Sequence, residues 1–134
     1  MKKTFNDLMR LDVIVAKLLK DNPSLFDTKF GIAYKKHLDK NLSVIMSKRN
    51  DGLNDIYLEN ALTDPATGAV LFDKDSELGY KVSKEGFKQI KEDVKEFTSK
   101  FDNTEYEVEP IACKELPEGF DVSPIKEIVE GLFV

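Results

Sequence analysis

Residues 84–101 carry the clearest pattern of apolar and polar positions in the chain. Their apolar residues recur at steps of three and four, so they fall on one face of a helix, with lysine and glutamate opposite. The members of this face are Phe87, Ile90, Val94, Phe97 and Phe101. Ser83 stands where a helix N-cap is expected. The pattern predicts a helix over 84–101 that packs against a second helix.

A second apolar stripe predicts a long helix over residues 28–62. Asp27 or Thr28 can cap its start, and the Thr-Asp-Pro sequence at 63–65 must end it, since proline lacks a backbone donor. Residues 48–52 interrupt the stripe, because a lysine, an arginine and a glycine occupy the seam positions. We expect one of three features there: a kink in the helix, a helix–helix interface that water partly enters, or a contact with something outside this helix pair.

Between the two helices, residues 69–82 contain two short runs of β-prone residues joined by a polar loop. This pattern predicts a β-hairpin. A lone two-stranded hairpin is marginally stable in water, so it must rest on the helix ends or on a partner.

The two ends of the chain predict further elements. Residues 4–21 are predicted to form a helix whose apolar positions are wider than one stripe, so it must be covered on more than one side. Residues 104–113 alternate like a strand, and 124–132 follow a Ser-Pro start typical of a helix. The predicted class is α+β, mostly α: a long antiparallel helical hairpin with a β-hairpin tip, an N-terminal helix, and a C-terminal strand and short helix. We expect one elongated domain over 1–134.

Charge and composition limit the classes of partner and the compartment that we expect for this protein. The 134 residues have a net charge of -5 and no basic stripe, so we expect no direct binding to duplex nucleic acid. The basic residues on the long helix are expected to be a solvated face; they are Lys35, Lys36, Lys40, Lys48 and Arg49. The single cysteine, Cys113, fits a reducing compartment, and no apolar run is long enough to span a membrane. We expect a cytoplasmic protein, neither secreted nor membrane-bound.

No motif for chemistry stands out. His37 has no partner at metal-ligand spacing, and residues 73–79 resemble a calcium loop only at its start, with the glycine misplaced. The glycines are scattered singly, so there is no phosphate cradle. We therefore predict no catalytic, cofactor or metal site, and a protein that is not an enzyme.

The remaining class is a protein that binds other proteins. Two groups of apolar residues are the predicted partner-binding positions, with ordinary core packing as the alternative for each residue. The first group lies on the hairpin and the second on the first helix; they are Val70, Leu71, Phe72 and Tyr80, and Leu11, Ile14 and Leu18.

The order of elements from residue 53 to residue 108 resembles a group of small uncharacterised proteins encoded among the structural genes of tailed bacteriophages. The segments that carry this resemblance are 56–59 (IYLE), 64–68 (DPATG), 79–82 (GYKV), 87–101 and 105–108 (EYEV). It implies a non-enzymatic role in a virion, a tail or head-tail assembly, with capsid, portal or tail proteins as partners, in the host cytoplasm or the particle.

A weaker resemblance is to prefoldin-type chaperone subunits, in which a β-hairpin also joins two antiparallel helices. The chain departs from that pattern in its extra N-terminal and C-terminal elements and in the interruption at 48–52. A third alternative is a small acidic phage-encoded inhibitor of a host protein, for which a charge of -5 is modest. Self-association into a homo-oligomer stays open, because an apolar seam does not reveal whether its partner is in the same chain.

Overall fold

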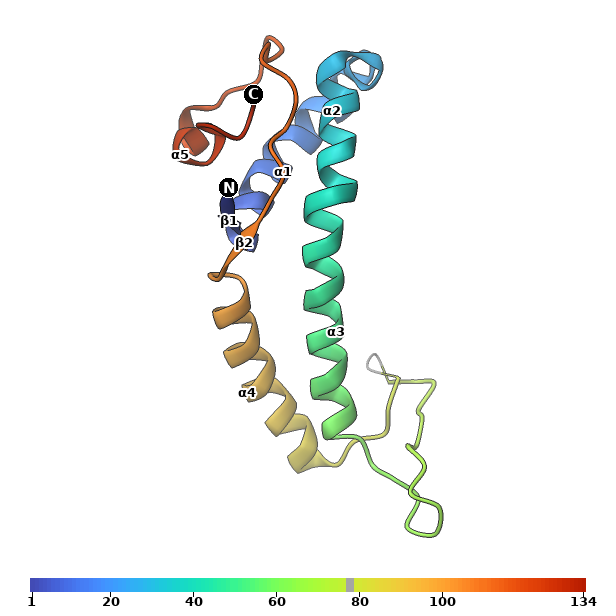
Figure 1. The fold of residues 1–134 in the computed structure, drawn as a ribbon. Helices are drawn as coiled ribbons and strands as arrows, with labels where there is room; N and C mark the ends of the chain where they lie inside the picture. Colours follow the sequence, from blue (N-terminus) through green and yellow to red (C-terminus); the bar gives the residue numbers. More distant parts are fainter. Residues whose placement is uncertain (77–78) are drawn as a thin grey trace. The chain divides into compact units, whose positions relative to one another are not determined.

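A computed structural model describes residues 1–76 and 79–134 (Figure 1). The chain is mostly helical with a small two-stranded antiparallel sheet, which confirms the predicted class at that level. Its internal contacts form two compact units, where the sequence led us to expect one domain. Unit 1 comprises Met1–Met46 and Asp102–Val134, and unit 2 comprises Ser47–Phe101.

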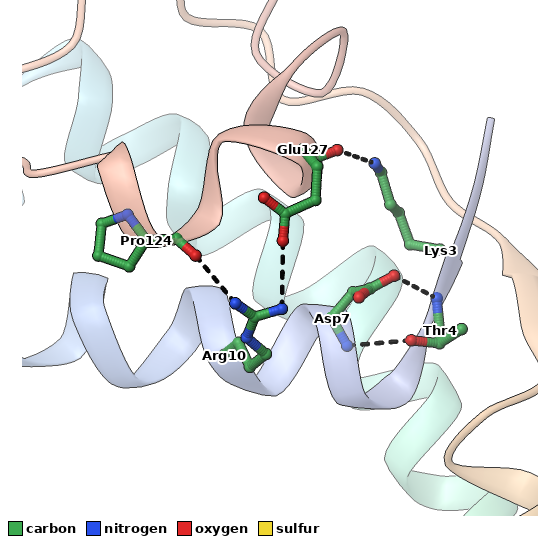
Figure 2. A network of polar contacts seen from close by, with 6 residues as sticks. All are labelled: Lys3, Thr4, Asp7, Arg10, Pro124 and Glu127. Atoms are coloured by element: carbon green, nitrogen blue, oxygen red, sulfur yellow. Dashed lines mark hydrogen bonds and ion pairs between the residues drawn. The ribbon is translucent and has the colours of Figure 1, made fainter.

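Unit 1 begins with a strand that leads directly into a helix. Strand β1 (Lys2–Thr4) pairs antiparallel with β2 (Glu105–Glu107), and α1 (Phe5–Asp21) follows. Thr4 caps α1: the Asp7 N–H donates to the Thr4 hydroxyl at 3.0 Å, and the Thr4 N–H donates to the Asp7 carboxylate at 3.3 Å (Figure 2). This reciprocal pair satisfies two backbone donors, so the start of α1 is fixed by local sequence.

The predicted strand over 104–113 was too long, because β2 contains only residues 105–107. Its partner β1 is three residues long, and the backbone of Glu109 pairs with a side chain, that of Asn41, instead of a strand. Pro110 then has no N–H to donate. Beyond it, Ile111 forms a single parallel bridge with Phe133.

The C-terminal segment is also less regular than the predicted helix over 124–132. A 3₁₀ turn, η3 (Ser123–Ile125), leads into the single turn α5 (Lys126–Val129), and Gly131 at φ 76° redirects the chain. Arg10 on α1 holds this segment by donating to the Pro124 carbonyl at 2.9 Å and to the Glu127 carboxylate at 3.2 Å (Figure 2). The side of α1 that faces α5 is therefore covered by the chain's own C-terminal segment.

The core of unit 1 lies around α1 and includes an aromatic cluster. Phe30 has its ring centroid 5.6 Å from that of Phe120 and 6.1 Å from that of Phe133. Side chains from α1, the middle of the chain and the C-terminal segment are fully buried together. They are Leu8, Leu11, Val15, Tyr34, Ile111, Ile125, Ile128 and Leu132.

The predicted long helix is present as three consecutive helical segments. After the 3₁₀ turn η1 (Pro23–Asp27), these are α2 (Lys29–His37), the π-helical turn η2 (Leu38–Leu42) and α3 (Ser43–Glu59). The helical backbone stops three residues before the predicted end at 62. Asn60 explains this end, since its side-chain amide donates to the Ile56 carbonyl at 2.9 Å. The Leu62 N–H donates to the Lys81 carbonyl instead of to a helical one.

In unit 2, α4 (Lys84–Phe101) has the bounds that the sequence predicted, and Figure 1 shows it running opposite to α3. The Gly86 N–H donates to the Ser83 hydroxyl at 2.9 Å, so Ser83 caps the helix. The interrupted seam of α3 has a direct explanation: a Cβ added at Gly52 would lie 2.3 Å from the ring of Phe97. The absence of a side chain at Gly52 therefore makes room for Phe97.

The described residues between α3 and α4 form three isolated antiparallel bridges: Ala61 with Val82, Thr63 with Val70, and Phe72 with Tyr80. The last bridge joins the two arms of the predicted hairpin. The prediction lacked a third segment, residues 61–63: it had placed residues 61 and 62 in the long helix and residue 63 in the sequence that stops that helix. Backbone hydrogen bonds of 2.8–3.0 Å link residues 62, 71 and 81 in a closed ring. Residues 77 and 78, in the predicted loop and second arm, lie outside the described part of the chain.

Candidate functional site

The predicted contact residues of the hairpin differ in how far they are exposed. Val70, Leu71 and Tyr80 are half-buried, whereas Phe72 is 70% exposed. The Phe72 and Tyr80 rings lie 5.5 Å apart at an angle of 34°, and the Tyr80 hydroxyl donates to the Asn54 side chain at 3.3 Å. Tyr80 is thus fixed against α3, and it supports a Phe72 ring that faces solvent.

The predicted contact surface on the first helix was wrong for two of its three residues. Leu11 and Leu18 are buried in the core of unit 1, and Ile14 is half-buried. Because α1 contacts β1, η1 and α5, its wide apolar surface is covered within the chain. Its large exposed apolar residue is Val13, at 67%.

Unit 2 exposes further apolar side chains that the sequence reasoning did not assign to a surface. Leu58, Leu62 and Phe87 are all exposed, and the Lys91 ammonium lies 4.7 Å from the centre of the Phe87 ring. Among the apolar side chains that the structure describes as buried, only Ile90 belongs to unit 2. The exposed residues of unit 2 were hard to identify from sequence because each also fits a helix seam or a strand.

Unit 1 contains a buried polar pair, His37 and Asn41, on the inner face of α2 and η2. The Asn41 amide donates to the Glu109 carbonyl at 2.8 Å, and its carbonyl oxygen accepts from the Glu109 N–H at 2.8 Å. The same amide nitrogen lies 2.9 Å from His37 Nδ1. Asn41 therefore pairs with the backbone of Glu109 as a strand residue would and also contacts the histidine. In the sequence, the only sign of this buried pair was an asparagine four residues after a histidine, next to the apolar Leu42.

These contacts determine the tautomer of His37. An amide nitrogen can only donate, so Nδ1 accepts and the proton of the neutral ring is on Nε2. Burial lowers the pKa of His37 from 6.5 to about 4, against an opposing effect of the Asp12 charge. Asp12 accepts a hydrogen bond from the Tyr34 hydroxyl at 2.7 Å, and burial raises the pKa of that tyrosine. His37 is thus neutral near pH 7, and in the described part of the chain its buried Nε2 has no hydrogen-bond partner.

In residues 1–76 and 79–134, no three histidine, cysteine, aspartate or glutamate side chains gather as a metal site would require. None of the described helices combines the length and apolar character needed to cross a membrane. No family model matches the sequence, and neither a curated protein nor a solved structure matches the chain.

Proposed function

We propose that the protein binds another protein through the exposed apolar residues of unit 2, with Phe72 as the main contact and unit 1 as the folded support. The observation that carries this proposal is the distribution of burial. Among the apolar side chains that the structure describes, unit 1 contains almost all of the buried ones, whereas unit 2 buries only Ile90 and exposes Leu58, Leu62, Phe72 and Phe87.

Phe72 has the properties of an interface anchor. An aromatic side chain that is well exposed in the free protein gains most from burial against a partner, and such residues dominate measured binding energies. The bridge to Tyr80 and the ring of backbone hydrogen bonds among residues 62, 71 and 81 hold the segment in place. A preorganised contact loses less entropy on binding. In the proposed architecture, α3 and α4 form a helical hairpin, and the segment between them is its β-hairpin tip.

The chemistry favours a protein partner over nucleic acid. The net charge of -5 opposes the approach of a polyanion, whereas apolar side chains suit a protein surface. The resemblance to proteins encoded among phage structural genes suggests where this binding is used. We propose a non-enzymatic role in the assembly of a phage head, tail or head-tail junction, with a capsid, portal or tail protein as the partner.

The test is to isolate complexes of the tagged protein from its native lysate and identify the partners by mass spectrometry. The wild-type chain is compared with Phe72→Asp and with Val13→Asp, a matched control because Val13 in unit 1 is similarly exposed, at 67% against 70%. We expect a particle protein in fixed ratio with the wild type and Val13→Asp, lost with Phe72→Asp. Circular dichroism must show equal helical content in all three chains.

Three results would contradict the proposal. A partner that Phe72→Asp retains would mean that the contact lies elsewhere. A broad set of unfolded proteins would favour the prefoldin-like alternative. A single host nuclease or polymerase would favour the acidic inhibitor.

A further inference from the structure

A buried cluster of hydrogen bonds in unit 1 has no part in the proposed function. It joins the helical segment α2–η2 to the chain that follows β2, and its members are His37, Asn41 and Glu109. His37 directly precedes the π-helical turn η2 and Asn41 lies within it, and both side chains are less than 5% exposed. Turns of this type occur frequently at functional sites.

The two bonds from Asn41 fasten residue 109 to the helix, and the residues that follow add no backbone donor to this attachment. Pro110 has no N–H. The Ile111 N–H donates to the Leu132 carbonyl at 2.7 Å, within the C-terminal part of unit 1. The attachment of this stretch to α2–η2 therefore depends on the Asn41 amide and on the ion pair between Lys40 and Glu109, at 3.4 Å.

The backbone of Glu109 determines how the Asn41 amide is oriented. The Glu109 N–H can only donate, so the atom 2.8 Å from it is the Asn41 carbonyl oxygen. The Glu109 carbonyl can only accept, so the other atom at 2.8 Å is the Asn41 amide nitrogen. The second N–H of that nitrogen is directed to His37 Nδ1, 2.9 Å away. The closed cluster thus requires an acceptor at Nδ1, which only the neutral ring supplies.

A proton on His37 is incompatible with this arrangement. In the charged ring both nitrogens are donors, so Nδ1–H would face an N–H of Asn41. If the Asn41 amide turned over, its oxygen could accept from Nδ1–H, but its nitrogen would then face the Glu109 N–H and its oxygen would leave that donor unpaired. The charged ring and the two bonds to Glu109 therefore exclude each other.

The charged and titratable groups around His37 belong to α1, to α2–η2 and to the chain that follows β2. Asp12 on α1 favours a proton on the ring, but burial has the larger effect and lowers the pKa of His37 to about 4. The lysines that line a groove together with His37 have the same charge as a protonated ring. The groups are Asp12, Tyr34, Lys29, Lys36, Lys40 and Glu109. The neutral ring is thus favoured for as long as the cluster stays closed.

We propose that His37 and Asn41 form an acid-released latch that holds residues 109–112 against α2–η2. In the closed latch, Nδ1 is buried and bonded, so a proton reaches it only after Asn41 has separated from Glu109. The proton then keeps the latch open, because the charged ring no longer accepts from Asn41. Acid thereby releases residues 109–112 while α1 stays folded. This device is in unit 1 and does not depend on the contacts proposed for unit 2.

Amide exchange of Glu109 measures the latch directly, because its N–H is bonded to Asn41. Hydrogen–deuterium exchange of ¹⁵N-labelled full-length protein is followed by NMR from about pH 7.5 to about pH 4.5, and each rate is divided by the intrinsic rate at that pH to give an opening constant. The Val108 N–H, bonded to the Met1 carbonyl at 2.9 Å, and the Leu11 N–H in α1 are internal references. His37→Gln is the matched variant, because glutamine retains an acceptor oxygen and does not titrate.

We expect the opening constant of Glu109 to rise by roughly 50- to 100-fold over this range, since opening returns the pKa of His37 from about 4 to 6.5. Val108 and Leu11 should change much less. In His37→Gln, Glu109 should show almost no rise, although the carboxylates of Asp12 and Glu109 are intact.

The wild-type profile alone can overturn the proposal, so the test does not rely on the folding of the variant. No rise at Glu109 would overturn it, and so would an equal rise at Leu11, which would indicate unfolding of the whole unit. The same rise in His37→Gln would assign the effect to the carboxylates and would also contradict the latch.

Discussion

Units 1 and 2 contain similar amphipathic helices and use them in different ways. In unit 1, the apolar residues of α1 meet the C-terminal segment and η1, so that Leu8, Leu11 and Val15 are fully buried. In unit 2, α4 has an equally regular apolar face, yet only Ile90 is buried and Phe87 is exposed. Periodicity shows that a face is apolar, but the rest of the chain determines whether that face is covered.

The two units also differ in the kind of side chain that lies in an unfavourable environment. Unit 1 buries a polar donor, His37 Nε2, whereas unit 2 exposes an aromatic ring, Phe72. Both arrangements cost free energy in the isolated chain. This contrast is why we assign apolar protein contacts to unit 2.

The largest expected effect is on the core of unit 1. Leu11→Ala should lower the free energy of unfolding by about 2–5 kcal/mol, because it leaves a cavity among fully buried side chains. Urea unfolding followed by circular dichroism measures this loss. Val13→Ala, two residues away and 67% exposed, should change stability by less than about 0.5 kcal/mol. Similar losses in the two variants would contradict the assignment of Leu11 to the core.

The second effect is a pH dependence of stability that His37 introduces. The unfolded ring binds a proton with a pKa of 6.5 and the folded ring with a pKa of about 4, so protons favour the unfolded state between these values. Stability should therefore decrease as the pH falls from 6.5 to 4, by roughly 3 kcal/mol at most. The measurement is urea unfolding at several pH values. His37→Gln should remove this part of the slope, and an unchanged slope would show that the folded-state pKa is not lowered.

A third effect should be confined to unit 2. Gly52→Val places a side chain where the Phe97 ring lies, and we expect this overpacking to cost about 1–3 kcal/mol. Amide hydrogen exchange should show weaker protection of α4 and unchanged protection of α1. Asp51→Val is the control, because Asp51 is exposed on the same helix. Equal loss of protection in α1 and α4 would mean that the two units do not respond separately.

The smallest effect on stability is expected at the proposed contact. Phe72→Ser should change the free energy of unfolding by no more than about 0.5 kcal/mol, since the ring is mostly solvated in the free protein. Ile90→Ala in the same unit should cost about 2–5 kcal/mol, because that side chain is buried. Thermal or urea unfolding distinguishes them. A large loss for Phe72→Ser would identify Phe72 as a core residue.

The sequence predicted the elements that local chemistry determines. The bounds of α4 follow from the Ser83 cap and the apolar repeat, and the start of α1 follows from the Thr4–Asp7 capping box. Non-local pairings could not be predicted in this way. The end of α3 depends on a backbone hydrogen bond between Leu62 and Lys81. The length of β2 depends on the side chain of Asn41, which lies 68 residues before Glu109 in the sequence.

The candidate sites were predictable only in part. The exposure of Phe72 could be predicted, because it lies in a short segment with little core of its own. Leu11 and Leu18 were assigned to a surface because the wide apolar face of the first helix does not reveal whether the C-terminal segment or another subunit covers it.

The most direct test of the central claim is site-specific photo-cross-linking in the native lysate. A photoreactive phenylalanine analogue replaces either Phe72 in unit 2 or Val13 in unit 1, positions of nearly equal exposure. The account predicts one discrete cross-linked protein from position 72 and none from position 13. Cross-links from position 13 alone, or the same adducts from both positions, would show that unit 2 does not carry the contact surface.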